Sequence, residues 1–102
     1  MDIDDIIEAI QQGQVQITDH ADEEAQDDDL GYEDIFFSVC GGEIIEQYPM
    51  EKPSPRCLIF GKTPQGEPVH SVWAYDQGRA VAVLITVYRP DPNRWIDWRI
   101  RK

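Results

Sequence analysis

The first half of this 102-residue chain contains no lysine or arginine. Residues 1–51 carry sixteen Asp and Glu side chains, whereas residues 52–102 carry four acidic and nine basic ones. The net charge of −11 therefore combines a strongly acidic half with a moderately basic half. An acidic chain lacks the clustered cations that nonspecific nucleic-acid binding requires, although a local basic groove formed by the second half remains compatible with this charge.

Long apolar runs and cysteine pairs are also missing. No stretch approaches the ~18 apolar residues that a membrane-spanning helix needs, so no membrane segment is expected. Cys40 and Cys57 are too far apart in sequence for a CxxC motif, and reduced thiols are the simplest interpretation. The acidic, amphipathic N-terminus differs from the basic leader of a secretory signal, which favours a cytoplasmic protein. With 41% hydrophobic residues, residues 1–102 are expected to form one packed domain.

Three helices are predicted in the first forty residues. Apolar side chains fall at helical spacing in residues 2–12, and Gly13 follows as a helix terminator. A second, surface helix is predicted for residues 19–30 and a third for residues 32–39. Residues 15–17 alternate apolar and polar side chains, which fits either a short strand or an extended link.

Strands are predicted in the second half of the chain. The pattern changes to strand-like alternation at residues 43–49 and 56–62, and residues 67–91 form an apolar hairpin. The tail, residues 93–102, contains Trp and basic residues and fits either a short helix or an added strand. The expected fold class is therefore α+β, with N-terminal helices packed on a four-stranded antiparallel meander.

The turn of the hairpin decides which side chains share a face. A three-residue loop at residues 76–78 places His70 opposite Leu84, and it puts both on one face with Thr86 and Tyr88. An alternative two-residue loop shifts the register by one residue and moves His70 to the other face. The three-residue loop is favoured because it ends in glycine, as such loops usually do.

Five segments together resemble one family, DUF4258. They are ITDHA at 17–21, GEIIEQYP at 42–49, CLIFG at 57–61, GEPVH at 66–70 and LITVYRPDPNRW at 84–95. The resemblance implies a fold like those of the RelE-like and barnase-like small ribonucleases. It also implies a toxin-like endoribonuclease of a toxin–antitoxin pair, acting on RNA without a metal ion or cofactor. A zinc-ribbon-type antitoxin is the partner that the resemblance implies.

The chain departs from the family pattern on the second predicted helix. Family members commonly carry arginines there, in an arrangement like HAxxRxxxR, whereas this chain has Glu24 and Asp28 at those places. Arginines could hold phosphate, but carboxylates would repel it. This departure weighs against RNA binding by this helix and against ribonuclease activity.

Two histidines are the candidate acid and base. His20 opens the second predicted helix among carboxylates, and the family match includes it; a helix-end histidine hydrogen-bonded to a nearby carboxylate is the alternative interpretation. His70 lies in an apolar strand, where a buried structural histidine is the alternative interpretation. A histidine with a pKa near neutrality could take the 2′-hydroxyl proton of RNA or protonate the leaving oxygen. Thr86 and Tyr88 are the candidate assisting residues, with ordinary strand packing as the alternative.

Arginines and tryptophans complete the set of candidates. Arg56 and Arg89 are predicted to bind phosphate, with ion pairing to the acidic half as the alternative. Trp95 and Trp98 could stack on bases or pack on the sheet. Trp73 is expected in the core, on the face opposite His70. A different interpretation of the whole chain is a non-catalytic module whose acidic half binds a basic partner.

Overall fold

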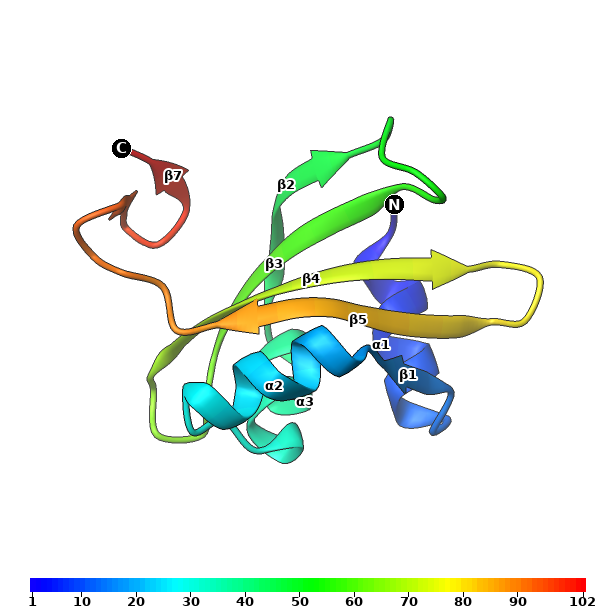
Figure 1. The fold of residues 1–102 in the computed structure, drawn as a ribbon, viewed down its shortest axis with the longest axis horizontal. Helices are drawn as coiled ribbons and strands as arrows, with labels where there is room; N and C mark the ends of the chain where they lie inside the picture. Colours follow the sequence, from blue (N-terminus) through cyan, green and yellow to red (C-terminus); the bar gives the residue numbers. More distant parts are fainter.

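The computed structural model describes all 102 residues as three helices and a five-stranded mixed sheet, which confirms the α+β class (Figure 1). The elements are α1 (Ile3–Gln11), β1 (Val15–Ile17), α2 (Asp19–Asp27), α3 (Tyr32–Cys40), β2 (Glu43–Tyr48), β3 (Arg56–Lys62), β4 (Pro68–Asp76), β5 (Val81–Tyr88), β6 (Trp95–Ile96) and β7 (Ile100–Arg101). The strand order in the large sheet is β1-β5-β4-β3-β2.

The prediction of a four-stranded antiparallel meander is correct only in part. Strands β2 to β5 pair antiparallel in chain order, but β1 adds a fifth strand that runs parallel to β5. Its three residues pair with Ala82 to Leu84, and the flanking backbone groups extend the contact, since Ala82 N–H donates to Gln14 C=O. A segment this short gains its strand geometry from the partner strand, which sequence alternation alone does not reveal.

The predicted hairpin loop is wrong. Asp76 pairs with Val81, so residues 77–80 form a four-residue loop. The Asp76 carboxylate accepts hydrogen bonds from the backbone N–H of Arg79 at 3.2 Å and from its guanidinium at 2.8 Å. The left-handed position assigned to Gly78 is taken instead by Ala80, with φ of 53°. The side-chain contacts of Asp76 therefore set a longer loop than the glycine position indicated.

A bulge then shifts the register within the hairpin. Trp73 pairs with Leu84, but beyond the bulge Val72 pairs with Thr86 and His70 pairs with Tyr88. The predicted pairing of His70 with Leu84 is therefore wrong. Because side chains alternate along a strand, the register does place His70, Thr86 and Tyr88 on one face, whereas Leu84 lies with Trp73 on the other.

The hydrophobic core lies between the helices and the face that carries Trp73, as expected. Trp73 is fully buried, and its indole N–H donates to Ser71 Oγ at 2.9 Å. Ile6, Val39 and Leu84 are buried in the same cluster. Helix α3 approaches β3 closely, because a Cβ atom added at Gly61 would lie 1.8 Å from the carbonyl oxygen of Ser38. None of the three helices has the length and apolar character needed to cross a membrane.

The C-terminal tail forms a small hairpin of its own. Strands β6 and β7 pair with each other apart from the large sheet and lie at the end where β5 finishes (Figure 1). Trp95 is buried, with its ring edge-on to His70 at 4.5 Å between centroids. The tail is thus a two-stranded hairpin whose first tryptophan covers the face that carries His70.

The close approach of α3 and β3 predicts a steep cost for any side chain at Gly61. Gly61→Ala should lower the free energy of unfolding by about 1–3 kcal/mol or more, because the new methyl group meets backbone rather than a flexible side chain. Gly78→Ala is the matched control: its Cβ would lie 3.5 Å from the nearest atom, so a change within about 0.5 kcal/mol is expected. Urea denaturation measures both, and equal effects would contradict the packing argument.

Candidate functional site

Helix α2 occupies the edge of the sheet where β1 stops. Thr18 begins this arrangement: its hydroxyl donates to Ile85 C=O at 3.1 Å and accepts the N–H of Ala21 at 3.1 Å, so it joins the strand edge to the helix N-terminus. One turn further, a Glu24 carboxylate oxygen accepts the Val87 N–H at 3.4 Å. The helix thus supplies the hydrogen bonds that β1 no longer provides.

Asp28 continues this edge contact at the end of β5. Its carboxylate accepts the backbone N–H of Arg89 at 2.8 Å. Glu24 and Asp28 are the two positions where the family commonly has arginine, and in this chain both carboxylates have structural partners on β5. The departure from the family pattern is therefore accommodated by the fold: these carboxylates satisfy backbone donors at an open strand edge.

His20 lies next to the same carboxylate. Its Nε2 is 3.0 Å from Glu24 Oε1, and its side chain is 69% exposed. The Thr86 hydroxyl also donates to Glu24 Oε1. One carboxylate oxygen therefore connects an exposed imidazole with a hydroxyl on β5. Of the predicted residues, the structure brings His20 and Thr86 together through Glu24.

His70 has a different environment. It is fully buried, and both ring nitrogens have partners: Nε2 lies 2.7 Å from the Trp98 carbonyl oxygen and Nδ1 lies 3.2 Å from the Tyr88 hydroxyl. A carbonyl oxygen can only accept, so we assign the proton to Nε2, and Nδ1 accepts from Tyr88. The ring is in edge contact with Phe60 and Trp95. His70 therefore joins β4, β5 and the tail, and it does not contact His20.

A hollow of about 560 Å³ opens beside Tyr88. Cations of the segment after β5 and of the tail dominate its lining, which consists of Tyr88, Arg89, Asp91, Asn93, Arg94, Trp95, Arg101 and Lys102. Tyr88 and Arg89 were predicted from the sequence as site residues, and Trp95 as a residue that either stacks on bases or packs on the sheet. The tail residues Arg94, Arg101 and Lys102 were not chosen as site residues. The mixture of tryptophan and basic side chains in the tail was the sequence signal that could have identified them.

Arg89 and Arg101 are already held by protein groups. Arg89 donates from Nε to the Asp28 carbonyl at 2.8 Å and lies 3.5 Å from Glu67, so it caps the end of α2. Arg101 donates to both carboxylate oxygens of Glu46 at 2.9 and 3.1 Å. Their guanidinium groups shape the hollow but are partly neutralised.

Arg56 lies away from these groups. It begins β3 and pairs with Ala74, whereas Phe60 of the same strand pairs with His70. Four residues of strand separate the two pairs, roughly 13 Å at 3.3 Å per residue. The nearest acceptor of the Arg56 guanidinium is the Lys52 carbonyl, at 3.5 Å. Arg56, which was predicted to bind phosphate, therefore lies apart from the other candidate residues.

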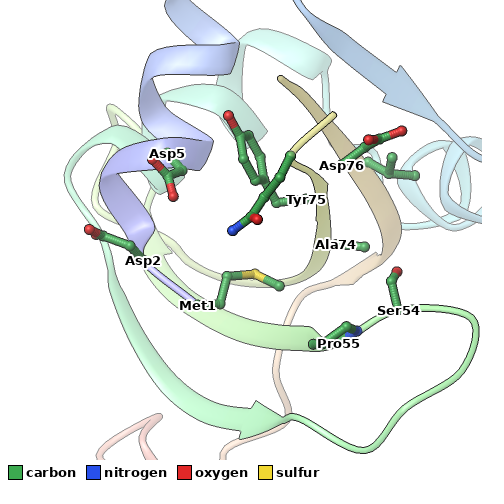
Figure 2. Close-up of a pocket in the computed structure, with 10 residues that line it drawn as sticks. Met1, Asp2, Asp5, Ser54, Pro55, Ala74, Tyr75 and Asp76 are labelled. Atoms are coloured by element: carbon green, nitrogen blue, oxygen red, sulfur yellow. The ribbon is translucent and has the colours of Figure 1, made fainter. Parts of the chain in front are cut away.

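A larger hollow, of about 720 Å³, lies at the other end of the hairpin (Figure 2). Its charged side chains are the carboxylates of Asp2, Asp5 and Asp76, and its lining contains no lysine, arginine or histidine. Asp2 caps α1 and Asp76 holds the hairpin loop. This hollow does not suit a phosphate ligand. No group of three or more His, Cys, Asp or Glu side chains is arranged to hold a metal ion.

The buried His70 predicts a pH-dependent contribution to stability. Burial lowers its pKa, while the Trp98 carbonyl and Glu46 raise it and Arg101 lowers it further. The unfolded chain, with an ordinary histidine pKa near 6.5, therefore binds the proton first as pH falls. The stability that neutral His70 provides is fully present above about pH 7 and is lost as pH falls through 6.5 and then through the folded pKa.

His70→Leu should lower the free energy of unfolding by about 2 kcal/mol at pH 7.5, because leucine leaves the Trp98 carbonyl and the Tyr88 hydroxyl without their partners. At pH 5 the difference between wild type and variant should be smaller. Denaturant unfolding at the two pH values measures both differences. A difference that stayed constant or grew toward pH 5 would contradict this assignment of His70.

The comparisons with known proteins agree with the resemblance seen in the sequence. The sequence profile described as "Domain of unknown function (DUF4258)" matches residues 17–89, which run from the last residue of β1 to the residue after β5. No curated protein and no solved structure matches the chain. Since the profile spans well over half of the residues, including His20, His70 and the edge contact between α2 and β5, the chain belongs to the DUF4258 family.

Proposed function

We propose that this protein is a toxin-type endoribonuclease whose reacting group is His20. The observation that carries the proposal is the exposed His20–Glu24 pair, next to the strand that leads into the basic hollow. Thr86, which contacts Glu24, and Tyr88, which lines the hollow, are two residues apart on one face of β5. Two residues of strand span roughly 7 Å, about the distance between neighbouring phosphates along RNA.

The proposed chemistry needs no metal ion or cofactor. His20 removes the proton from a ribose 2′-hydroxyl, and the 2′-oxygen attacks the adjacent phosphorus. The bond from phosphorus to the 5′-oxygen breaks, water protonates the leaving oxygen, and a 2′,3′-cyclic phosphate remains. Glu24 stabilises the imidazolium that forms on His20, and cations of the hollow stabilise the charge that develops on phosphate.

The other predicted residues support this site indirectly. Thr86 donates to Glu24 and so acts as a positioning residue for the His20–Glu24 pair. His70, with both ring nitrogens occupied, holds Tyr88 and the tail that carries the cations. In this proposal one exposed histidine replaces the pair of catalytic histidines predicted from the sequence.

Cleavage of a single-stranded RNA oligonucleotide by purified protein tests the proposal. His20→Ala should reduce the rate by about 100-fold or more, the usual contribution of general acid–base catalysis. Glu24→Gln, which keeps an acceptor for Thr86 but removes the charge, should reduce it less. Arg79→Ala, in the hairpin loop at the far end of the sheet, is the control and should leave the rate unchanged. Equal rates in wild type and His20→Ala would refute the proposal.

A second candidate function rests on the unpaired acidic surface. Of the sixteen carboxylates in residues 1–51, only Glu24, Glu43 and Glu46 take part in ion pairs. This surface suits a basic partner such as an antitoxin, and binding of that kind weakens steeply with salt. Capture of a co-expressed basic partner by both wild type and His20→Ala, with no RNA cleavage by wild type, would favour this candidate.

A further inference from the structure

We propose that the basic hollow beside Tyr88 binds a backbone phosphodiester of a single-stranded nucleic acid, with Arg94 and Lys102 as the contacting cations. The inference rests on the proposed function, because it names a substrate subsite at the end of β5, the strand that contacts the His20–Glu24 pair through Thr86. Neither residue belongs to the segment that matches the family profile, which ends at residue 89. The cations therefore come from a part of the chain that the profile does not describe.

The tail hairpin brings these two cations together. Its turn is closed by a hydrogen bond from Arg99 N–H to Ile96 C=O at 3.0 Å, and Lys102 N–H donates to Arg94 C=O at 3.0 Å across the hairpin. Their side chains therefore start from adjacent backbone positions and line the same hollow. Two cations from neighbouring strands can contact different oxygens of one phosphate group.

Arg94 and Lys102 are also the free cations of the hollow. Arg89 and Arg101 are paired with Glu67 and Glu46, whereas no carboxylate lies within ion-pair distance of Arg94 or Lys102. Both are exposed and can reach a ligand without breaking an existing interaction. A phosphate that binds here exchanges water for a charge-assisted hydrogen bond and does not first have to separate an ion pair.

The charge balance favours a phosphodiester. Asp91 also lines the hollow, and its carboxylate is fixed by a hydrogen bond from Asn93 N–H at 2.9 Å. Among the side chains that line the hollow, two unpaired cations and one carboxylate leave an excess of one positive charge, which suits the single negative charge of a diester.

Tyr88 adds an acceptor on the wall of the hollow. Its hydroxyl donates to His70 Nδ1, so the outward lone pairs of the oxygen can accept from a ribose hydroxyl or a base N–H. A hollow of about 560 Å³ lies within the range of small-molecule binding pockets, roughly 300–1,000 Å³, and can hold one nucleotide unit.

An NMR titration with a single-stranded thymidine deoxyhexamer that lacks terminal phosphates tests the site. This probe has phosphodiesters but no 2′-hydroxyl, so it cannot be cleaved by the proposed chemistry. Amide shifts are expected at residues 88–95 and 101–102. Arg94→Glu with Lys102→Glu should weaken binding by about tenfold or more, since it removes both charge-assisted contacts and places two carboxylates beside the phosphate.

Lys52→Glu with Lys62→Glu is the matched control, because both lysines are exposed, neither is ion-paired and the change in net charge is the same. Less than about twofold weakening is expected. Equal weakening in the two double variants would show nonspecific charge attraction and overturn the site. If the charge reversal disturbs the tail, Arg94→Gln with Lys102→Gln should still weaken binding and lower the salt dependence by about one to two phosphate contacts.

Parallel titrations distinguish a phosphodiester from a terminal phosphate as the ligand, and they test the phosphate site separately from the ribonuclease activity. Tighter binding of thymidine 5′-monophosphate than of the hexamer in the hollow would overturn the diester assignment in favour of a terminal phosphate. Binding of the hexamer without RNA cleavage would refute the ribonuclease and leave the site intact. RNA cleavage with unchanged KM in the Arg94→Glu, Lys102→Glu variant would refute the site and leave the ribonuclease.

Discussion

The position of α2 depends on which groups accept hydrogen bonds from the backbone N–H groups at the outer edge of β5. The parallel strand β1 pairs with only three residues of β5. Beyond them, Val87 and Arg89 have backbone N–H groups that need acceptors. Glu24 and Asp28 supply them. Since an unpaired buried donor costs about 1–3 kcal/mol, these carboxylates stabilise the fold and set the position of α2 along the strand. The position of His20 follows directly from that contact.

A second contact, through His70, places the tail. The imidazole donates to the Trp98 carbonyl and accepts from Tyr88, so one buried side chain connects the central hairpin to the last residues of the chain. Asp97 and Trp98 both take left-handed backbone conformations, with φ of 51° and 61°. Residues other than glycine seldom adopt this backbone geometry unless other contacts offset its energetic cost. The hydrogen bond from His70 to the Trp98 carbonyl is one such contact. The basic hollow therefore depends on a histidine that does not line it.

Much of the fold could be predicted from the sequence, because periodic patterns report local structure. The apolar residues of α1 and the strand-forming residues of β3 to β5 identify those elements. The parallel β1, the bulge between Val72 and Trp73 and the loop set by Asp76 could not be predicted, since each depends on contacts between segments or on one side chain binding backbone.

The candidate site was only partly predictable for the same reason. His20, Thr86 and Tyr88 were identified by residue type and face. Glu24 stood out only as a departure from the family pattern, because its acceptors and donors come from β5, far away in sequence. Arg94 and Lys102 are adjacent only because the tail forms a hairpin, and a tail that fits helix or strand equally well does not show that adjacency.

The carboxylates of Glu24 and Asp28, which contact the edge of β5, also affect how the molecule meets other copies of itself. An open strand edge is a template for pairing with another chain, and natural sheets block such edges with charge, bulges or covering elements. Helix α2 covers the β5 edge, while β2, the other outer strand, has a bulge between Ile44 and Glu46 and carries Glu43. Carboxylates of the acidic half thus oppose edge-to-edge pairing at β2 and at the part of β5 that β1 leaves open.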